Sequence, residues 1–175
     1  MGRADQKIIP NRYQVVPRTL CFIIHEDELL LLRGAPDKRI WPNRYNGVGG
    51  HVKPNEDVYA AARREVREET GLEAQDLRLR GVVNIPVDAQ SKRGVMLFIF
   101  TAVALARAVY PSSEGAPSEE GVPEWVPAAR LSELPLVEDL STLIPRVLAM
   151  GPDAPPFFAH YHYNAQDQLV ITFSE

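Results

Sequence analysis

The sequence predicts one α/β (α+β) domain in which helices pack on a central sheet. Two features support this fold class. Apolar runs typical of strands recur along the 175 residues and are separated by polar turns. Two stretches with helical periodicity, residues 57–69 and 137–150, lie far apart in the chain. A chain of this length can bury one substantial core, so residues 1–175 are expected to form a single domain.

The first third of the chain is expected to form two paired strands and a basic loop. Residues 1–17 are predicted as an N-terminal extension or an edge strand. Strands at 18–25 and 28–33 are joined by a tight polar turn. The loop at 34–46 carries basic residues that could steer a polyanion toward a nearby site. Arg33, at the end of its strand, is expected to contact phosphate.

A glycine-rich stretch leads into the first helix. Gly49 and Gly50 belong to a short apolar strand predicted over residues 47–52, the glycine segment, and allow close approach to a ligand. The helix predicted over 57–69 has acids at its start, where the helix dipole favours them. Gly71 is predicted as its left-handed C-cap.

Two carboxylates fall in the middle of the helix face that should be buried. At about 100° per residue, Glu65 and Glu69 lie within about 20° of Val58, and Glu68 lies about 80° away. Carboxylates about 5 Å apart repel by roughly 3 kcal/mol at an effective dielectric near 20. Such a cluster favours a hard divalent cation, Mg²⁺ or Mn²⁺. The alternative is ordinary ion pairing, for which Arg64 and Glu68 have the right spacing.

The second half of the chain is expected to contribute strands, a long loop and a late helix. The predicted elements are strands at 77–87 and 95–105, a short strand at 124–126, a helical turn at 128–134, and a terminal hairpin of 157–164 with 169–173. Gly81 should kink its strand, and Pro145 should kink or split the helix at 137–150. His160 and His162 share one strand face, opposite a face of aromatic and small residues. This alternation favours a polar surface over a metal site.

The loop at 110–121 is longer than most connections, which is typical of functional loops. Its acidic residues are Glu114, Glu119 and Glu120.

Nine residues between positions 50 and 72 share the spacing of one known motif. They are Gly50, Glu56, Arg64, Glu65, Val66, Glu68, Glu69, Gly71 and Leu72. This pattern is the Nudix box. Through it the chain resembles the Nudix hydrolases, which cleave a nucleoside diphosphate linked to another group. The resemblance implies a Nudix-type α/β/α sandwich with a mixed central sheet and one helix on each side.

The resemblance also implies a role for each position of the box. The implied metal ligands and catalytic glutamates are Glu65, Glu68 and Glu69, together with the backbone carbonyl of Gly49. Arg64 is implied to orient the acids. The implied structural positions are Gly50, Glu56 and Gly71. The implied cofactor is Mg²⁺, for which Mn²⁺ can substitute, and in related enzymes a glutamate of the 110–121 loop can join the metal.

Residues 18–173 resemble the MutT-like branch of this family, whose members hydrolyse oxidised purine nucleoside triphosphates such as 8-oxo-dGTP. In that branch an asparagine at the position of Asn46 reads the base, and an acidic pair at Glu138 and Asp139 reads the purine edge. Members of that branch have an aspartate pair next to a tryptophan, whereas here Leu136, Val137 and Leu140 flank a Glu-Asp pair. Tyr45 precedes Asn46 where an indole is often found, and Trp41 lies four residues earlier. These departures leave the base preference open. Helix capping is the alternative role for the acidic pair. A carboxyl in this apolar setting is expected to have a raised pKa.

Three functions remain open. The first is Mg²⁺-dependent hydrolysis of a purine nucleoside triphosphate to the monophosphate and pyrophosphate. The second keeps the chemistry but takes ADP-ribose or another nucleotide sugar, in enzymes that often dimerise. The third is a non-catalytic nucleotide-binding module, which would be expected to lack an acid of the box, whereas none is missing.

The composition agrees with a nucleotide as the partner. Hydrophobic residues make up 45% and charged residues 24%, and the net charge of −4 argues against a nucleic-acid-polymer or membrane surface. No apolar stretch has membrane-spanning length, and charges near the start interrupt any secretory segment. Cys21, the only cysteine, is expected as a buried small hydrophobe. A cytoplasmic monomer or homodimer is expected.

Overall fold

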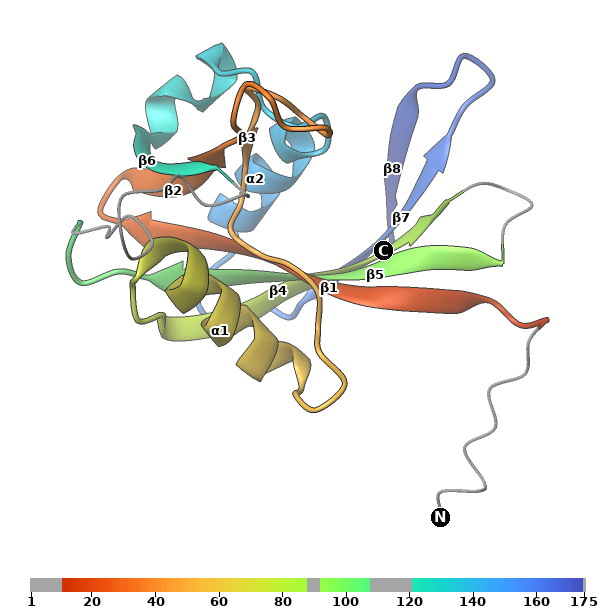
Figure 1. Cartoon of the computed structure of the whole chain (residues 1–175), viewed down its shortest axis with the longest axis horizontal. Helices are drawn as coiled ribbons and strands as arrows, with labels where there is room; N and C mark the ends of the chain where they lie inside the picture. Colours follow the sequence, from red (N-terminus) through yellow and green to blue (C-terminus); the bar gives the residue numbers. More distant parts are fainter. Residues whose placement is uncertain (1–10, 88–91, 108–120, 175) are drawn as a thin grey trace.

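A computed structural model describes residues 11–87, 92–107 and 121–174. Within these residues eight strands form one mixed sheet, and two α-helices lie on its opposite faces (Figure 1). The elements are β1 (Gln14–His25), β2 (Glu28–Arg33), β3 (Tyr45–Asn46), α1 (Val58–Thr70), β4 (Gln75–Pro86), β5 (Arg93–Val103), β6 (Val122–Pro127), a 3₁₀ helix (Ala128–Glu133), α2 (Leu140–Leu148), β7 (Phe157–Tyr163) and β8 (Leu169–Phe173). The predicted sandwich is therefore confirmed.

The sheet has the strand order β3-β2-β1-β5-β4-β7-β8, with β6 paired to β2. Strand β1 runs parallel to β5 and antiparallel to β2. Strand β4 runs antiparallel to β5 and parallel to β7. The predicted hairpins β4–β5 and β7–β8 are both present, and the ladder shifts register at Gly81, where the kink was expected.

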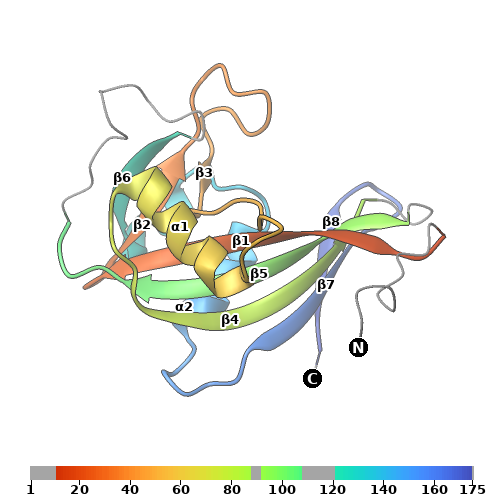
Figure 2. The ribbon, with the colours of Figure 1, turned by 60° about the horizontal axis from the view of Figure 1, so that its bottom comes forward.

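The sheet divides the core into two layers, because a helix packs on each face (Figure 2). Val66 of α1 belongs to the layer that contains Cys21 and Phe100. Leu143 of α2 belongs to the layer that contains Ile99. Each fully buried aliphatic side chain stabilises the fold by about 1.5–3 kcal/mol. Cys21 is fully buried as expected, and this burial raises the pKa of its thiol.

Both ends of α1 are fixed by local bonds. The Asp57 carboxylate accepts the backbone N–H groups of Tyr59 and Ala60 at 2.9 and 2.8 Å. Gly71 adopts φ = 71° and donates its N–H to the Arg67 carbonyl at 2.9 Å. Such caps stabilise a helix by about 1 kcal/mol. Neither helix of the described residues combines the length and apolar character that crossing a bilayer requires.

The glycine segment is not the regular strand that was predicted. Regular pairing with β2 stops at Asn46, the end of β3. Beyond it only isolated bridges join Val48 to Cys21 and His51 to Arg18 on β1. The segment therefore follows β1 without forming a continuous ladder.

Helix α2 begins at Leu140 and not at residue 137 as predicted. The reason is a long-range pairing: Val137 donates its N–H to the Tyr45 carbonyl at 2.9 Å, and Tyr45 donates to the Pro135 carbonyl at 3.0 Å. Residues 135–137 are thus held extended beside β3. Pro145 lies inside α2 without splitting it.

We expect Gly81→Ala to destabilise the protein by about 1–3 kcal/mol through overpacking. A Cβ on Gly81 would overlap the Phe157 ring, which is held by an edge contact with Phe173 at 5.5 Å. Gly151→Ala is the matched control, since a Cβ there meets nothing within 4 Å among the described residues. Urea unfolding midpoints would measure both, and equal midpoints for the two variants would contradict the expectation.

Candidate active site

Helix α1 turns two glutamates toward the glycine segment and two arginines toward solvent. The side chain of Glu65 is 13% exposed, and Glu69 is buried. Glu68 is half exposed, while Arg63 and Arg67 point outward. The orientations expected from helical geometry are confirmed for these residues.

Arg64 is the centre of the charge network on this helix. Its guanidinium donates to both carboxylate oxygens of Glu56, at 2.6 and 3.0 Å. It also donates to Glu65 at 2.8 Å and to Glu68 at 2.9 Å, so the expected pair with Glu68 is present. A further bond reaches the His51 carbonyl at 3.1 Å. One cation thus bonds to three carboxylates, and these bonds, chiefly that with Glu56, raise the pKa of Arg64.

Two glycines let the backbone approach the glutamates closely. Gly49 donates its N–H to Oε2 of Glu69 at 2.9 Å. Its φ is 156°, and a Cβ there would overlap the Thr19 carbonyl. A Cβ on Gly50 would lie 2.5 Å from Oε1 of Glu65. A side chain at Gly49 would displace the backbone of β1, so this position requires glycine. A side chain at Gly50 would displace the Glu65 carboxylate.

The chemistry of these groups fits a hard divalent cation. The carboxylates of Glu65 and Glu69 lie against the backbone of Gly49 and Gly50, and carboxylate and carbonyl oxygens are the donors that such ions prefer. Thr19, whose backbone carbonyl lies against Gly49, has a buried hydroxyl without a hydrogen-bond partner in the described structure. That hydroxyl is a polar atom still available to a bound group.

The carboxylates do not form a preassembled metal cage. In the part of the chain that the structure describes, no three His, Cys, Asp or Glu side chains converge in a way that could hold a metal ion. Ion pairs with Arg64 hold Glu65 and Glu68 instead. The acidic residues predicted in the long loop, Glu114, Glu119 and Glu120, lie outside the described residues.

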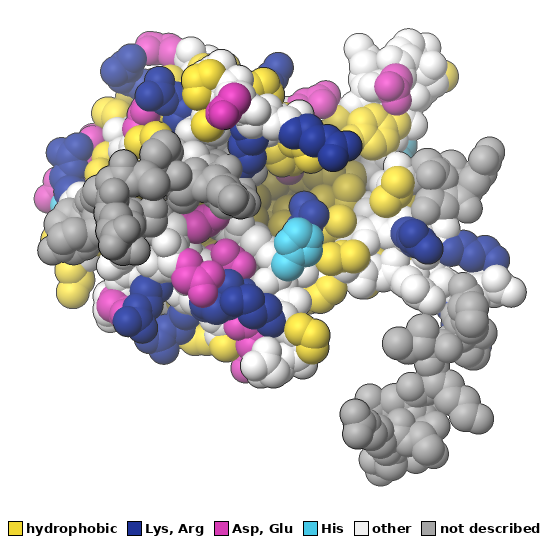
Figure 3. All heavy atoms as spheres, viewed as in Figure 1, with side chains coloured by type: hydrophobic (Ala, Val, Ile, Leu, Met, Phe, Trp, Pro, Cys, Tyr) yellow, Lys and Arg dark blue, Asp and Glu magenta, His cyan; other side chains and the backbone are white. Residues whose placement is uncertain are grey.

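A pocket of about 470 Å³ adjoins the same glycines, because Gly49 and Gly50 also contribute to its lining. It lies on the α2 face of the sheet, where Leu20 and Leu97 form part of its wall. Figure 3 shows it as a hollow with mostly hydrophobic walls. The glycine segment therefore joins an acidic cluster to an apolar pocket.

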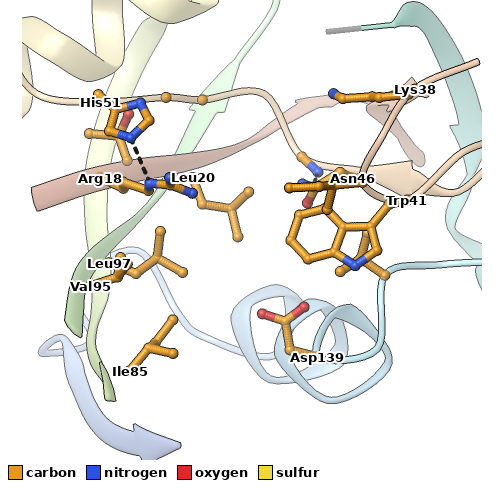
Figure 4. Close-up of a pocket in the computed structure, with 16 residues that line it drawn as sticks. Arg18, Leu20, Lys38, Trp41, Asn46, His51, Ile85, Val95, Leu97 and Asp139 are labelled. Atoms are coloured by element: carbon orange, nitrogen blue, oxygen red, sulfur yellow. Dashed lines mark hydrogen bonds between the residues drawn. The ribbon is translucent and has the colours of Figure 1, made fainter. Parts of the chain in front are cut away.

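Of the four residues that were predicted to bind substrate, only two line the pocket. Asn46 and Asp139 both line the pocket and lie toward the same end of it (Figure 4). Glu138 is exposed and is not part of the pocket lining. Arg33 forms an ion pair with Glu124 at 2.8 Å, and that carboxylate also accepts the Tyr45 hydroxyl at 2.7 Å. Arg33 is thus engaged away from the pocket.

Asp139 has the altered acidity that its apolar setting predicted. Burial raises the pKa of its carboxyl, and a hydrogen bond from the Tyr161 hydroxyl at 3.0 Å partly opposes this shift. Within the described structure Asp139 makes no side-chain bond that caps α2. Asp139 nevertheless occupies the N-cap position of α2, so the capping alternative rests on the place of this acid at the positive end of the helix.

Three pocket residues escaped the sequence analysis. Arg18 donates from Nε to Nε2 of His51 at 3.1 Å, at the end of the pocket opposite Asn46 (Figure 4). This contact depends on the isolated bridge between β1 and the glycine segment. No local sequence pattern predicts that bridge. Trp41 lines the pocket near Asn46. Its signals in the sequence were an aromatic side chain in a polar loop and its place four residues before Tyr45, near the position where an indole is often found in the MutT-like branch.

The fold, the glycine segment and the glutamate helix are those expected of a Nudix hydrolase. Comparison with known families agrees: the NUDIX domain matches residues 15–147. The chain belongs to the Nudix family and is a Nudix pyrophosphohydrolase. Members of this family generally use a divalent metal.

Two relatives share one name, "Oxidized purine nucleoside triphosphate hydrolase". The Danio rerio protein is 32% identical over 107 residues, covering 61% of this chain and 63% of the relative, which is less than two thirds of its length. The Mus musculus protein is 27% identical over 154 residues, covering 87% of this chain and 89% of the relative.

Solved structures show the same fold. The MutT protein from Bacillus halodurans superposes with a TM-score of 0.74 at 23% identity, covering 91% of this chain and 97% of that one. The Nudix domain of NrtR from Shewanella oneidensis, in complex with ADP ribose, gives 0.67 at 15% identity and covers 85% and 97%.

We expect Glu56→Gln to remove a pH-dependent part of the stability. Hydrogen bonds from Arg64, and secondarily from the Lys53 N–H, lower the pKa of Glu56 from 4.5 to about 2. A lowered carboxyl pKa stabilises the fold fully above the unfolded value, and this contribution is lost as pH falls from 4.5 toward 2.

The measurement is the urea midpoint of wild type and variant across that pH range. The difference between them should be largest near neutral pH and should shrink toward pH 2. Glu133→Gln, which alters only an exposed pair with Arg130, is the control. A difference that stays constant with pH would contradict the role of Glu56.

Proposed function

We propose that this chain hydrolyses a purine nucleoside triphosphate, with oxidised purines such as 8-oxo-dGTP as preferred substrates, to the nucleoside monophosphate and pyrophosphate. The observation that carries the proposal is the pocket that shares Gly49 and Gly50 with the glutamate cluster and contains Asn46 and Asp139 at one end. Phosphates beside the glutamates would leave the base within reach of that end. The names of the two relatives support the same substrate class.

The box residues supply the catalytic groups of this proposal. Glu65, Glu68, Glu69 and the carbonyl of Gly49 would hold Mg²⁺, or Mn²⁺ in its place. When bound, the metal neutralises the diphosphate and lowers the pKa of water. Arg64 orients the acids through its bonds to Glu65 and Glu68. A glutamate of the box, or one of the 110–121 loop, takes the proton of the attacking water.

The base end of the pocket offers donors and acceptors in an apolar setting. The Asn46 amide oxygen accepts the Gly47 N–H at 2.9 Å, which sets the orientation of the amide. Because its pKa is raised, the Asp139 carboxyl keeps its proton to higher pH than an ordinary aspartate and can donate to an acceptor on a purine edge. A purine lacking the matching group would leave this carboxyl unpaired, which is the physical basis of selectivity.

A turnover panel tests the substrate. With Mg²⁺, 8-oxo-dGTP and dGTP should be hydrolysed faster than ADP-ribose or diadenosine polyphosphates, and excess EDTA should abolish turnover. The second candidate, an ADP-ribose or nucleotide-sugar pyrophosphatase, draws on the neighbour bound to ADP ribose. Preferential turnover of ADP-ribose would replace the first proposal with this one.

Asp139→Ala should raise KM for the preferred purine triphosphate by roughly ten- to a hundredfold, because an unpaired buried group costs about 1–3 kcal/mol. Hydrolysis of inorganic triphosphate should change far less, since the metal ligands are untouched. Glu138→Ala is the matched control, because this neighbour is exposed and outside the pocket. Purine selectivity that survives Asp139→Ala would remove the base-reading role.

Glu68→Gln and Glu69→Gln should each abolish most activity while the protein remains folded, because each removes a charge that a divalent cation requires. Loss of carboxylate repulsion offsets part of any destabilisation. Turnover and melting curves with and without Mg²⁺ measure both effects. The Mg²⁺-dependent rise in Tm should shrink in these variants and persist in Glu73→Gln, an exposed acid just beyond α1. Unchanged activity in both variants would refute the metal site.

A further inference from the structure

The loop between β2 and β3, residues 34–44, places a tryptophan in the wall of the pocket. Trp41 contributes to the lining, and Figure 4 shows its indole toward the same end as Asn46 and Asp139. The side chain is nevertheless 46% exposed, and the neighbouring Ile40 is 57% exposed. An apolar surface thus stands open to solvent beside polar groups that can read a base.

The backbone at this tryptophan is held in an unfavourable conformation. Trp41 has φ = 56°, in the left-handed region that bulky side chains rarely occupy. Bonds that close the loop maintain it: Gly34 donates to the Arg44 carbonyl at 3.0 Å, and Arg44 donates to the Trp41 carbonyl at 3.2 Å. The Arg44 side chain also donates to the Leu136 carbonyl at 3.0 Å, which ties the loop to the segment before α2. Strain that the surroundings enforce in this way is typical of functional sites.

Folding alone does not account for this arrangement. A large aromatic side chain stabilises a fold by being buried, yet this one is strained and left half open. The other tryptophan of the chain behaves differently. The indole N–H of Trp125 donates to the Arg107 carbonyl at 3.0 Å, and its ring lies 5.7 Å from that of His25. Trp125 therefore has a structural role, whereas nearly half of the Trp41 surface is open to solvent.

We propose that the indole of Trp41 stacks on the nucleobase of the bound substrate, while Asn46 and Asp139 contact the base edge. The inference rests on the proposed function only in taking a base as the group that enters this end of the pocket. Every nucleobase has a π face, so stacking contributes affinity with little selectivity. Selectivity then belongs to the edge contacts, and the two roles are separable by mutation.

Fluorescence tests the stacking directly. Trp125→Phe leaves Trp41 as the only tryptophan, because the chain has two. Titration with dGMP or 8-oxo-dGMP, neither of which carries the anhydride bond that is cleaved, should quench or shift its emission, whereas ribose 5-phosphate should not. The converse variant, Trp41→Phe, should show no such response from Trp125. Unchanged Trp41 emission at saturating dGMP, with binding verified by calorimetry, would overturn the proposal.

Kinetics supply an independent readout. Trp41→Asn removes the ring but keeps a residue that tolerates the left-handed backbone, so the loop should retain its shape. It should raise KM for purine triphosphates roughly five- to a hundredfold, the range for loss of one aromatic stack, with kcat little changed. Trp41→Phe should restore most of the affinity. A wild-type KM for Trp41→Asn would overturn the proposal.

The outcome also separates this inference from the proposed substrate. If Trp41 emission responds to ADP-ribose while purine triphosphates are not hydrolysed, the proposed function fails and the stacking stands, since ADP-ribose also carries a base. If purine triphosphates are hydrolysed but Trp41→Asn binds them as wild type does, the stacking fails and the function stands.

Discussion

The bonds of Arg64 are the constraint on which the active-site region depends. A single guanidinium joins Glu56, before the helix, to Glu65 and Glu68 on it, and also holds the His51 carbonyl. Without this cation the carboxylates would repel each other, and the turn before α1 would lose its anchor to the helix. Because the arginine side chain is only 19% exposed, solvent screens these interactions less than those of a surface pair.

This anchoring places one backbone segment between two kinds of chemistry. Toward α1, Gly49 meets Glu69, and Gly50 lies against Glu65. Toward α2, the same two glycines line the pocket, whose wall includes Leu20. A side chain at Gly49 would overlap the backbone of β1, and one at Gly50 would displace the Glu65 carboxylate. The acidic cluster and the apolar pocket therefore lie on either side of the same two glycines. A substrate with a charged end and an aromatic end can contact both.

Local periodicity predicted much of this arrangement, and long-range contacts account for what it missed. The orientations of Glu65 and Glu69 followed from helical geometry alone, because α1 is regular and capped at both ends. The start of α2 was wrong because Val137 pairs with Tyr45, far away in sequence. Arg33 was expected at phosphate, but its partner Glu124 comes from β6. Such contacts are set by packing and leave no local signature in the sequence.

The end of the pocket that is proposed to take the base is assembled from three separate elements, the 34–44 loop, β3 and the segment before α2. Tyr45 pairs with that segment through its backbone, and Arg44 reaches it through its side chain. The glutamates, by contrast, all lie on α1. Substitutions at this end of the pocket can thus leave the residues proposed to hold the metal undisturbed, and on the proposed function they would change which base is bound. Trp41 brings an indole to this end of the pocket from the 34–44 loop, whereas Leu136, in the segment before α2, is not part of the pocket lining.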